Sequence, residues 1–206
     1  MSEDEAAIWE RRYRSGRRLV DDYDPWLASW RPEFVARNGR ALDIGCGEGR
    51  DTEVLLGWGF DVTAFDRSSA AVELSRARNP AAHHQVMDIR ELGQLDVHFA
   101  VVVANLTLHY FDRTETLASF AEIHRLLEPA GLFAFRVDAA PDGGGAESES
   151  WARVDQEGVG KQVFTTRKLD EALAGRFRVL SQEKWTIGRH GRPKRLFEVI
   201  AESQQG

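Results

Sequence analysis

Asp43-Ile44-Gly45-Cys46-Gly47-Glu48-Gly49 is the stretch that decides the fold of this 206-residue chain. A short apolar run, Arg40 to Ile44, precedes it, and a helix-like segment, Asp51 to Trp58, follows it. Glycine at every second position lets the backbone turn sharply and lets a ligand approach the main chain closely. The free N–H groups at a helix start also attract anions. A strand, a glycine loop and a helix in this order indicate an α/β domain that holds a nucleotide-like cofactor.

The rest of the chain alternates between strand-like and helix-like segments, which predicts a parallel sheet with helices on both faces. The expected strands are Ala41 to Ile44, Phe60 to Phe65, His83 to Met87, Val97 to Ala104 and Leu132 to Val137. Two further strand-like runs, Phe177 to Ile187 and Arg195 to Ala201, are joined by a short glycine-containing connection and predict an antiparallel hairpin at the sheet edge. The expected fold is therefore α/β: a Rossmann-like, seven-stranded, mostly parallel sheet that ends in an antiparallel hairpin strand.

Composition limits the classes of function. A chain of 206 residues suits one domain, residues 1–206, and its net charge of −6 disfavours nucleic acid as the main partner. The only cysteine, Cys46, excludes internal disulfides, and the scattered histidines indicate no metal site. No apolar run approaches the roughly 20 residues that span a bilayer, and the N-terminus is acidic. We expect a cytoplasmic protein with no membrane partner.

Two segments interrupt the α/β alternation. Residues 1–38 are expected to form an N-terminal helical cap, in which Trp9 and Tyr13 are four positions apart and share one helix face. That helix either docks on the core or places an aromatic flap over the cofactor cleft. Residues 139–163 contain three consecutive glycines among acidic residues and are expected to form a flexible insertion on the substrate side.

The spacing of the glycines distinguishes the sequence pattern of this loop from the patterns of two common nucleotide-binding loops. The dinucleotide pattern G-x-G-x-x-G would need a glycine where Arg50 stands, and the P-loop pattern G-K-[ST] is absent. The pattern present, D-x-G-x-G-x-G, resembles the first motif of class I S-adenosylmethionine-dependent methyltransferases. The likeness runs from about Trp9 to Ala201 and is strongest to small single-domain bacterial enzymes related to the tellurite-resistance and thiopurine methyltransferases.

This resemblance implies S-adenosyl-L-methionine as the cofactor. Gly45, Cys46 and Gly47 would present their backbone to the methionine part, and Asp43 would orient the amino group. Trp9 and Tyr13 would cover the cofactor.

The resemblance also implies that residues at the ends of the next three strands complete the cofactor site. Asp66, followed by Arg67, resembles the family acid that accepts both ribose hydroxyls, a task suited to the two oxygens of a carboxylate. Asp88 and Ile89 resemble the adenine site. The segment that begins with Asn105 and Leu106 lies where the family places the methyl group and the acceptor.

His109 and Tyr110, just past the fourth expected strand, are the candidate catalytic residues. An imidazole titrates near working pH and can act as a general base, whereas a histidine at a helix start can also serve only to bond the backbone. Tyr110 would position an acceptor or pack against its neighbours. Asp138 would face the acceptor or cap the insertion.

These observations predict an enzyme that transfers a methyl group from S-adenosylmethionine to a small-molecule acceptor, as a monomer or homodimer. Three alternatives stay open: a methyltransferase that acts on RNA or protein, a non-catalytic binder of the cofactor, and a nicotinamide-dependent oxidoreductase.

Overall fold

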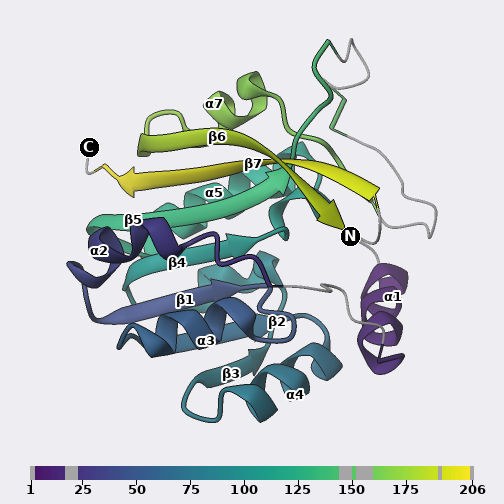
Figure 1. Ribbon diagram of the computed structural model, residues 1–206, viewed down its shortest axis with the longest axis vertical. Helices are drawn as coiled ribbons and strands as arrows, with labels where there is room; N and C mark the ends of the chain where they lie inside the picture. The colour runs from purple at the N-terminus through teal and green to yellow at the C-terminus, as the bar shows by residue number, and fades with distance from the viewer. Residues whose placement is uncertain (1–2, 17–22, 144–149, 152–159, 190–191, 205–206) are drawn as a thin grey trace.

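The computed structural model describes residues 3–16, 23–143, 150–151, 160–189 and 192–204. Seven strands form one sheet in the order β3-β2-β1-β4-β5-β7-β6. The pairs among β1 to β5 are parallel, whereas β7 is antiparallel to both β5 and β6 (Figure 1). The predicted fold class is confirmed.

The strands are β1 (Arg40–Ile44), β2 (Asp61–Asp66), β3 (His83–Val86), β4 (Phe99–Asn105), β5 (Leu127–Asp138), β6 (Phe177–Arg189) and β7 (Arg192–Ser203). The α-helices are α1 (Glu3–Arg14), α2 (Arg31–Val35), α3 (Arg50–Gly57), α4 (Ser69–Arg78), α5 (Arg113–Leu126) and α7 (Thr166–Leu173). Three short 3₁₀ helices are η1 (Ala28–Trp30), η2 (Ile89–Gln94) and η3 (Leu108–Tyr110).

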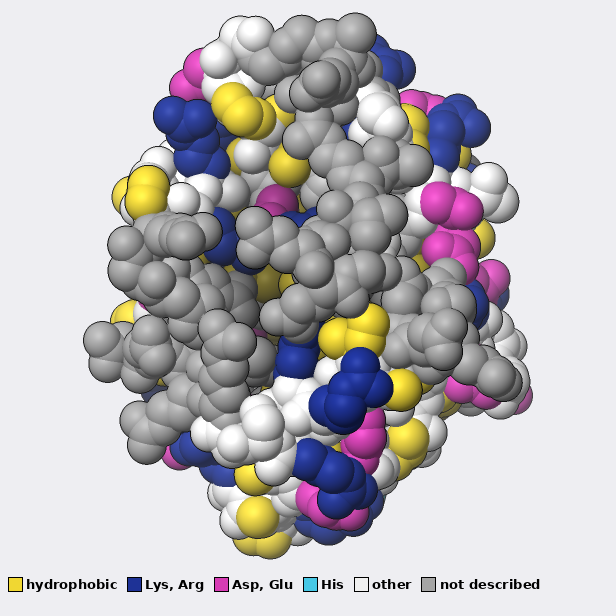
Figure 2. Space-filling model, turned by 90° about the vertical axis from the view of Figure 1, so that its right-hand side faces the viewer, with side chains coloured by type: hydrophobic (Ala, Val, Ile, Leu, Met, Phe, Trp, Pro, Cys, Tyr) yellow, Lys and Arg dark blue, Asp and Glu magenta, His cyan; other side chains and the backbone are white. Residues whose placement is uncertain are grey.

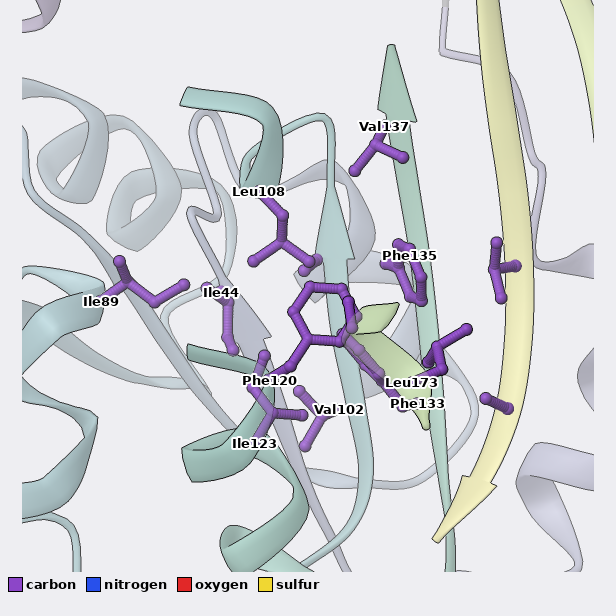
Figure 3. Packing of buried hydrophobic residues seen from close by; sticks show 14 of the residues in the cluster. Ile44, Ile89, Val102, Leu108, Phe120, Ile123, Phe133, Phe135, Val137 and Leu173 are labelled. Carbon is purple, nitrogen blue, oxygen red and sulfur yellow. The ribbon is translucent and has the colours of Figure 1, made fainter. Parts of the chain in front are cut away.

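Apolar side chains pack on both faces of the central strands. Because successive residues of a strand point to opposite faces, Val102 and Ala104 of β4 face one cluster while Val101 and Val103 face the other. Helices α5 and α7 cover the first face, where Phe120 of α5 packs edge-on against two phenylalanines of β5 (Figure 3). The second face is covered by α3 and by residues 26–34, among them the fully buried Leu27 and Phe34.

Within the expected N-terminal cap, residues 26–34 pack into the core of the domain, whereas α1 lies near the carboxyl ends of the parallel strands (Figure 1). Part of the expected insertion is likewise tied to the sheet. Ala139 bridges to Phe164, and the Gln162 amide donates to the carbonyl of His109 at 2.8 Å. Residues 144–149 and 152–159 of the expected insertion lie outside the described residues.

Strand β5 begins earlier than the sequence predicts. The sequence pattern predicts a strand that begins at Leu132, after the break Pro129-Ala130-Gly131, but Leu127 already pairs with Phe99. The register then shifts, so that Val101 pairs with Leu132, and Ala130 adopts a left-handed φ of +59°. The expected break is thus an irregularity within the strand.

The order of the strands determines where a ligand can bind. Strand β1 lies between β2 and β4, and the direction in which the chain is added to the sheet reverses there. In open α/β sheets ligands bind outside the carboxyl ends of the strands at such a switch point. The glycine loop follows β1 directly.

Phe120→Ala tests the packing of the first face. Phe120 is fully buried, so its truncation is expected to lower the free energy of unfolding by about 3–5 kcal/mol in urea denaturation. Leu74→Ala is the control: Leu74 is 43% exposed on α4, and its truncation is expected to change stability by less than about 0.5 kcal/mol. Equal losses in the two variants would contradict this packing.

Candidate active site

The glycine loop between β1 and α3 has a backbone that residues with side chains rarely adopt. Gly45, Gly47 and Gly49 have φ values of +67°, +52° and +78°. A Cβ at Gly45 would lie 2.3 Å from Oγ1 of Thr107, and one at Gly47 would lie 2.8 Å from the Tyr13 hydroxyl. The loop therefore depends on glycine for both its conformation and its close contacts.

Asp66 fixes the loop from the end of β2. Its Oδ2 accepts a hydrogen bond from the Gly47 amide at 3.1 Å, and its Oδ1 accepts one from the Ser68 amide at 2.9 Å. Burial raises the pKa of Asp66 to about 6, although these two amides oppose the rise. The predicted ribose-binding acid therefore also stabilises the loop.

Helix α1 lies over the loop and is held there at three points. The Tyr13 hydroxyl lies beside Gly47, and the Trp9 ring packs edge-on against Tyr110 with centroids 4.9 Å apart. Glu10 accepts hydrogen bonds from the Ser68 and Ser69 hydroxyls and from the Ala70 amide at the start of α4. The Ser68 hydrogen bond is the main reason why the pKa of Glu10 falls to about 2. The helix thus both docks on the domain and covers the loop.

Two buried carboxylates lie under the switch point. Asp43 accepts a hydrogen bond from the Thr52 hydroxyl at 2.6 Å. Burial, followed by the charge of Asp51, raises the pKa of Asp43 to about 8. Asp51 accepts hydrogen bonds from the Tyr23 hydroxyl, the Trp26 ring nitrogen and the Asn105 amide.

The side-chain amide of Asn105 has a partner for its nitrogen and none among the described residues for its oxygen. Its amide nitrogen donates to Asp51 at 2.8 Å, whereas its Oδ1 is buried without a hydrogen-bond donor among the described residues. Leu106 follows with a φ of +57°, a strained conformation for a residue with a branched side chain. Buried unsatisfied acceptors and backbone strain concentrate at ligand sites.

Asp88 lies at the start of η2 and is held by arginines. Arg90 donates to Asp88 from its backbone amide and its guanidinium, and Arg67 lies 3.6 Å away. Burial alone would raise the pKa of Asp88, but the hydrogen bonds from Arg90 keep it below its usual value. Ile89 beside it is 5% exposed. An adenine at this position would have to share Asp88 with Arg90.

His109 and Tyr110 lie in η3, beyond the end of β4. The His109 side chain is fully buried, with Nε2 3.7 Å from a carboxylate oxygen of Asp138, and its Nδ1 accepts a hydrogen bond from the Asp138 amide at 3.3 Å. Lys161 and Lys194 contact the two oxygens of the same carboxylate at 2.6 and 2.7 Å. Tyr110 stacks beside His109, with centroids 4.3 Å apart.

The residues predicted from the sequence thus fall into three neighbouring groups at the carboxyl edge of the sheet. Tyr13 lies beside Gly47, whose amide donates to Asp66. Asp43 lies close to Asp51, which accepts from Asn105, and Asp88 and Ile89 lie past β3. Figure 2 shows this edge from outside, with basic and acidic side chains beside residues that the structure does not describe.

The arrangement fits S-adenosylmethionine. The buried Oδ1 of Asn105 and the carboxylate of Asp43 suit a cationic amino group, and the two oxygens of Asp66 suit two hydroxyls.

Several residues of this edge were not predicted. Asp51 was interpreted only as the first residue of a helix, and Tyr23, Trp26, Lys161 and Lys194 were not assigned to a site. An acid directly after the glycine loop was a usable signal for Asp51. The others come from distant segments, and no local pattern marks them.

Comparison with known proteins finds similarity to methyltransferases. The model of the methyltransferase domain family matches residues 41–131. Malonyl-[acyl-carrier protein] O-methyltransferase of Enterobacter lignolyticus is 30% identical over 139 residues, which are 68% of this chain and 54% of that protein. EEF1A lysine methyltransferase 4 of Bos taurus is 31% identical over 66% of this chain and 62% of its own length. The chain spans little more than half the length of these relatives.

Solved structures agree on the fold. The 1,6-didemethyltoxoflavin-N1-methyltransferase of Burkholderia thailandensis has a TM-score of 0.71 at 24% identity, covering 100% of this chain and 92% of that one. TehB of Haemophilus influenzae has a TM-score of 0.71 at 14% identity, covering 95% of this chain and 67% of that one. These matches and the shared fold support a class I S-adenosylmethionine-dependent methyltransferase.

Among the residues that the structure describes, no three His, Cys, Asp or Glu side chains gather where they could hold a metal ion. None of the helices described is long and apolar enough to cross a membrane.

Gly45→Ala tests the loop geometry in the ligand-free protein. Strain and the contact with Thr107 are expected to lower the free energy of unfolding by about 1–3 kcal/mol, measured in urea. Gly57→Ala is the matched control, because Gly57 lies in α3 with no atom within 4 Å of the added Cβ. It is expected to gain up to about 1 kcal/mol. A Gly45 variant as stable as the wild type would refute the assigned loop conformation.

Proposed function

We propose that this protein transfers the methyl group of S-adenosyl-L-methionine to a small-molecule or carrier-bound acceptor. The observation that carries the proposal is the glycine loop hydrogen-bonded to Asp66, with the buried oxygens of Asp43 and Asn105 beside it at the switch point. The similarity of residues 41–131 to the methyltransferase domain family supports the same cofactor. A cytoplasmic location and a monomeric or homodimeric state remain parts of the proposal.

The bound cofactor would supply an activated methyl group on a sulfonium, so the task of the chain is binding, alignment and exclusion of water. Asp66 would hold the ribose hydroxyls and Asp88 with Ile89 the adenine. Asp43 and Asn105 would hold the amino group. The residues of α1 would exclude water from above, because Tyr13 and Trp9 lie over the loop and over Tyr110.

The acceptor would bind where β4 and β5 end, beside Tyr110. Tyr110 is partly exposed and has aromatic contacts with Trp9 and His109. His109 would act as a base only if its ring reached the acceptor. In the present arrangement the ring is buried against Asp138, which favours positioning over proton transfer.

The names of two relatives indicate two different classes of acceptor. One is named as a methyltransferase of a malonyl group on a carrier protein, the other as a lysine methyltransferase of a protein. We favour the first class because Lys161 and Lys194 lie against Asp138 at the end of β5, and lysines attract anions and repel a substrate lysine. The experiment is a screen of carboxylate, amine and thiol acceptors and of tRNA, scored by S-adenosylhomocysteine release. Calorimetry with NADH instead of S-adenosylmethionine tests the oxidoreductase alternative.

Asp66→Ala is expected to weaken cofactor binding tenfold or more in calorimetry, because hydrogen bonds to a charged group contribute about 1.5–3 kcal/mol each. Asp61→Ala is the control: Asp61 is a 58% exposed acid at the opposite end of the same strand. An equal dissociation constant in the two variants would refute the ribose role of Asp66.

Cofactor affinity is expected to rise with pH between about 6 and 8. In the free protein Asp43 keeps its proton up to a pKa of about 8, whereas a cationic amino group favours the ionised carboxylate. Binding must then release a proton, and each pH unit below the pKa weakens binding by up to about tenfold. Calorimetry in buffers of different ionisation enthalpy measures the proton directly. Asp43→Asn is expected to remove the release, and an unchanged release would contradict the role of Asp43.

A further inference from the structure

A cluster at the end of β5 joins two lysines and a histidine to one carboxylate. Asp138 is almost buried, with 10% of its side chain exposed, and it contacts Lys161, Lys194 and His109. The side chains of Lys161 and Lys194 are 30% and 16% exposed, so both lysines still reach the surface, and an ammonium group has three N–H donors with which to bind a second anion.

The cluster lies beside the residues proposed to receive the acceptor. Lys161 Nζ is 5.9 Å from the centroid of the Tyr110 ring, and Trp9 packs against the same ring. Lys161 comes from residues 160–163 and Lys194 from β7, so two segments distant in sequence converge on Asp138. Asp138 thereby holds two flexible ammonium groups close together, which lowers the entropy cost of binding a further anion.

The acidic and basic side chains at this edge of the sheet are divided. Asp43 and Asp51 lie under the glycine loop after β1, where the cationic cofactor is proposed to bind. The lysines lie beyond β4, on the acceptor side. This division is complementary to a cationic donor and an anionic acceptor, and it would repel an ammonium or guanidinium acceptor.

We propose that the acceptor is a carboxylate, bound by Lys161 and Lys194 and converted to its methyl ester. This inference rests on the proposed function, which supplies the sulfonium methyl donor. A carboxylate oxygen forms the new C–O bond, the S–CH₃ bond breaks, and its electron pair stays on sulfur. No proton is transferred, so the reaction needs no base, in agreement with the burial of His109 against Asp138. The two lysines orient the carboxylate, and His109 and Asp138 are positioning residues.

The test uses the malonyl and succinyl monothioesters of N-acetylcysteamine as probes, with the corresponding terminal amides as uncharged controls. Binding is measured by calorimetry in the presence of S-adenosylhomocysteine, and methyl ester formation with S-adenosylmethionine is measured by mass spectrometry. We expect the wild type to bind at least one carboxylate probe, to methylate it, and to bind neither amide measurably.

Lys161→Gln and Lys194→Gln are each expected to weaken binding of the carboxylate probe tenfold or more, with unchanged affinity for S-adenosylhomocysteine. Arg178→Gln is the matched control, because Arg178 is a 58% exposed cation paired with Glu202 at the other end of the hairpin. It should bind the probe like the wild type.

Asp138→Asn separates ligand binding from a structural role. If the lysines bind the acceptor, removal of the competing carboxylate leaves probe affinity equal or higher. If the lysines only hold residues 160–163 in place, this variant loses affinity as the lysine variants do, and the inference is overturned. It is also overturned if neither carboxylate binds, if the amides bind equally well, or if amines are methylated instead. Failure to bind S-adenosylhomocysteine would instead refute the proposed function itself.

Discussion

The hydrogen bond from the Gly47 amide to the Asp66 carboxylate is the contact on which the rest of this edge depends. It joins the loop after β1 to the end of β2 and keeps the left-handed glycines in place. The Ser68 amide donates to the same carboxylate, and Ser68 is the N-cap of α4 and a partner of Glu10. One buried carboxylate thus connects the loop, the start of α4 and, through Ser68, the covering helix α1.

The acids at the switch point come from neighbouring elements of the chain, whereas the lysines on the acceptor side come from segments that are distant in sequence. Asp43 and Asp51 come from β1 and α3, elements that are short and close in sequence. Lys161 and Lys194 reach Asp138 only because β7 inserts antiparallel between β5 and β6 and because residues 160–163 return to the end of β5. The sheet topology therefore places acidic side chains on one side of β4 and basic side chains on the other.

The parts of the fold that depend on local pattern could be predicted from the sequence. The apolar run of β4, the Ser68 cap and the terminal hairpin all have short-range signals, and the structure contains each of them. The start of β5 was predicted wrongly because Pro129 to Gly131 is a reliable breaker locally, whereas the pairing of Leu127 with Phe99 is a long-range contact. The candidate site could be predicted in part for the same reason. An acid at the end of a strand, such as Asp66, is visible in the local sequence pattern, whereas the partners of Asp51 and Asp138 are determined by tertiary packing.

A crystal structure of the chain with S-adenosylhomocysteine tests the central claim most directly. The account predicts a ligand along the carboxyl ends of β1, β2 and β4, with its ribose hydroxyls on Asp66 and its amino group beside Asp43 and Asn105. A ligand bound elsewhere, or a glycine loop that stays closed by Tyr13 in crystals grown with a saturating amount of the compound, would contradict it.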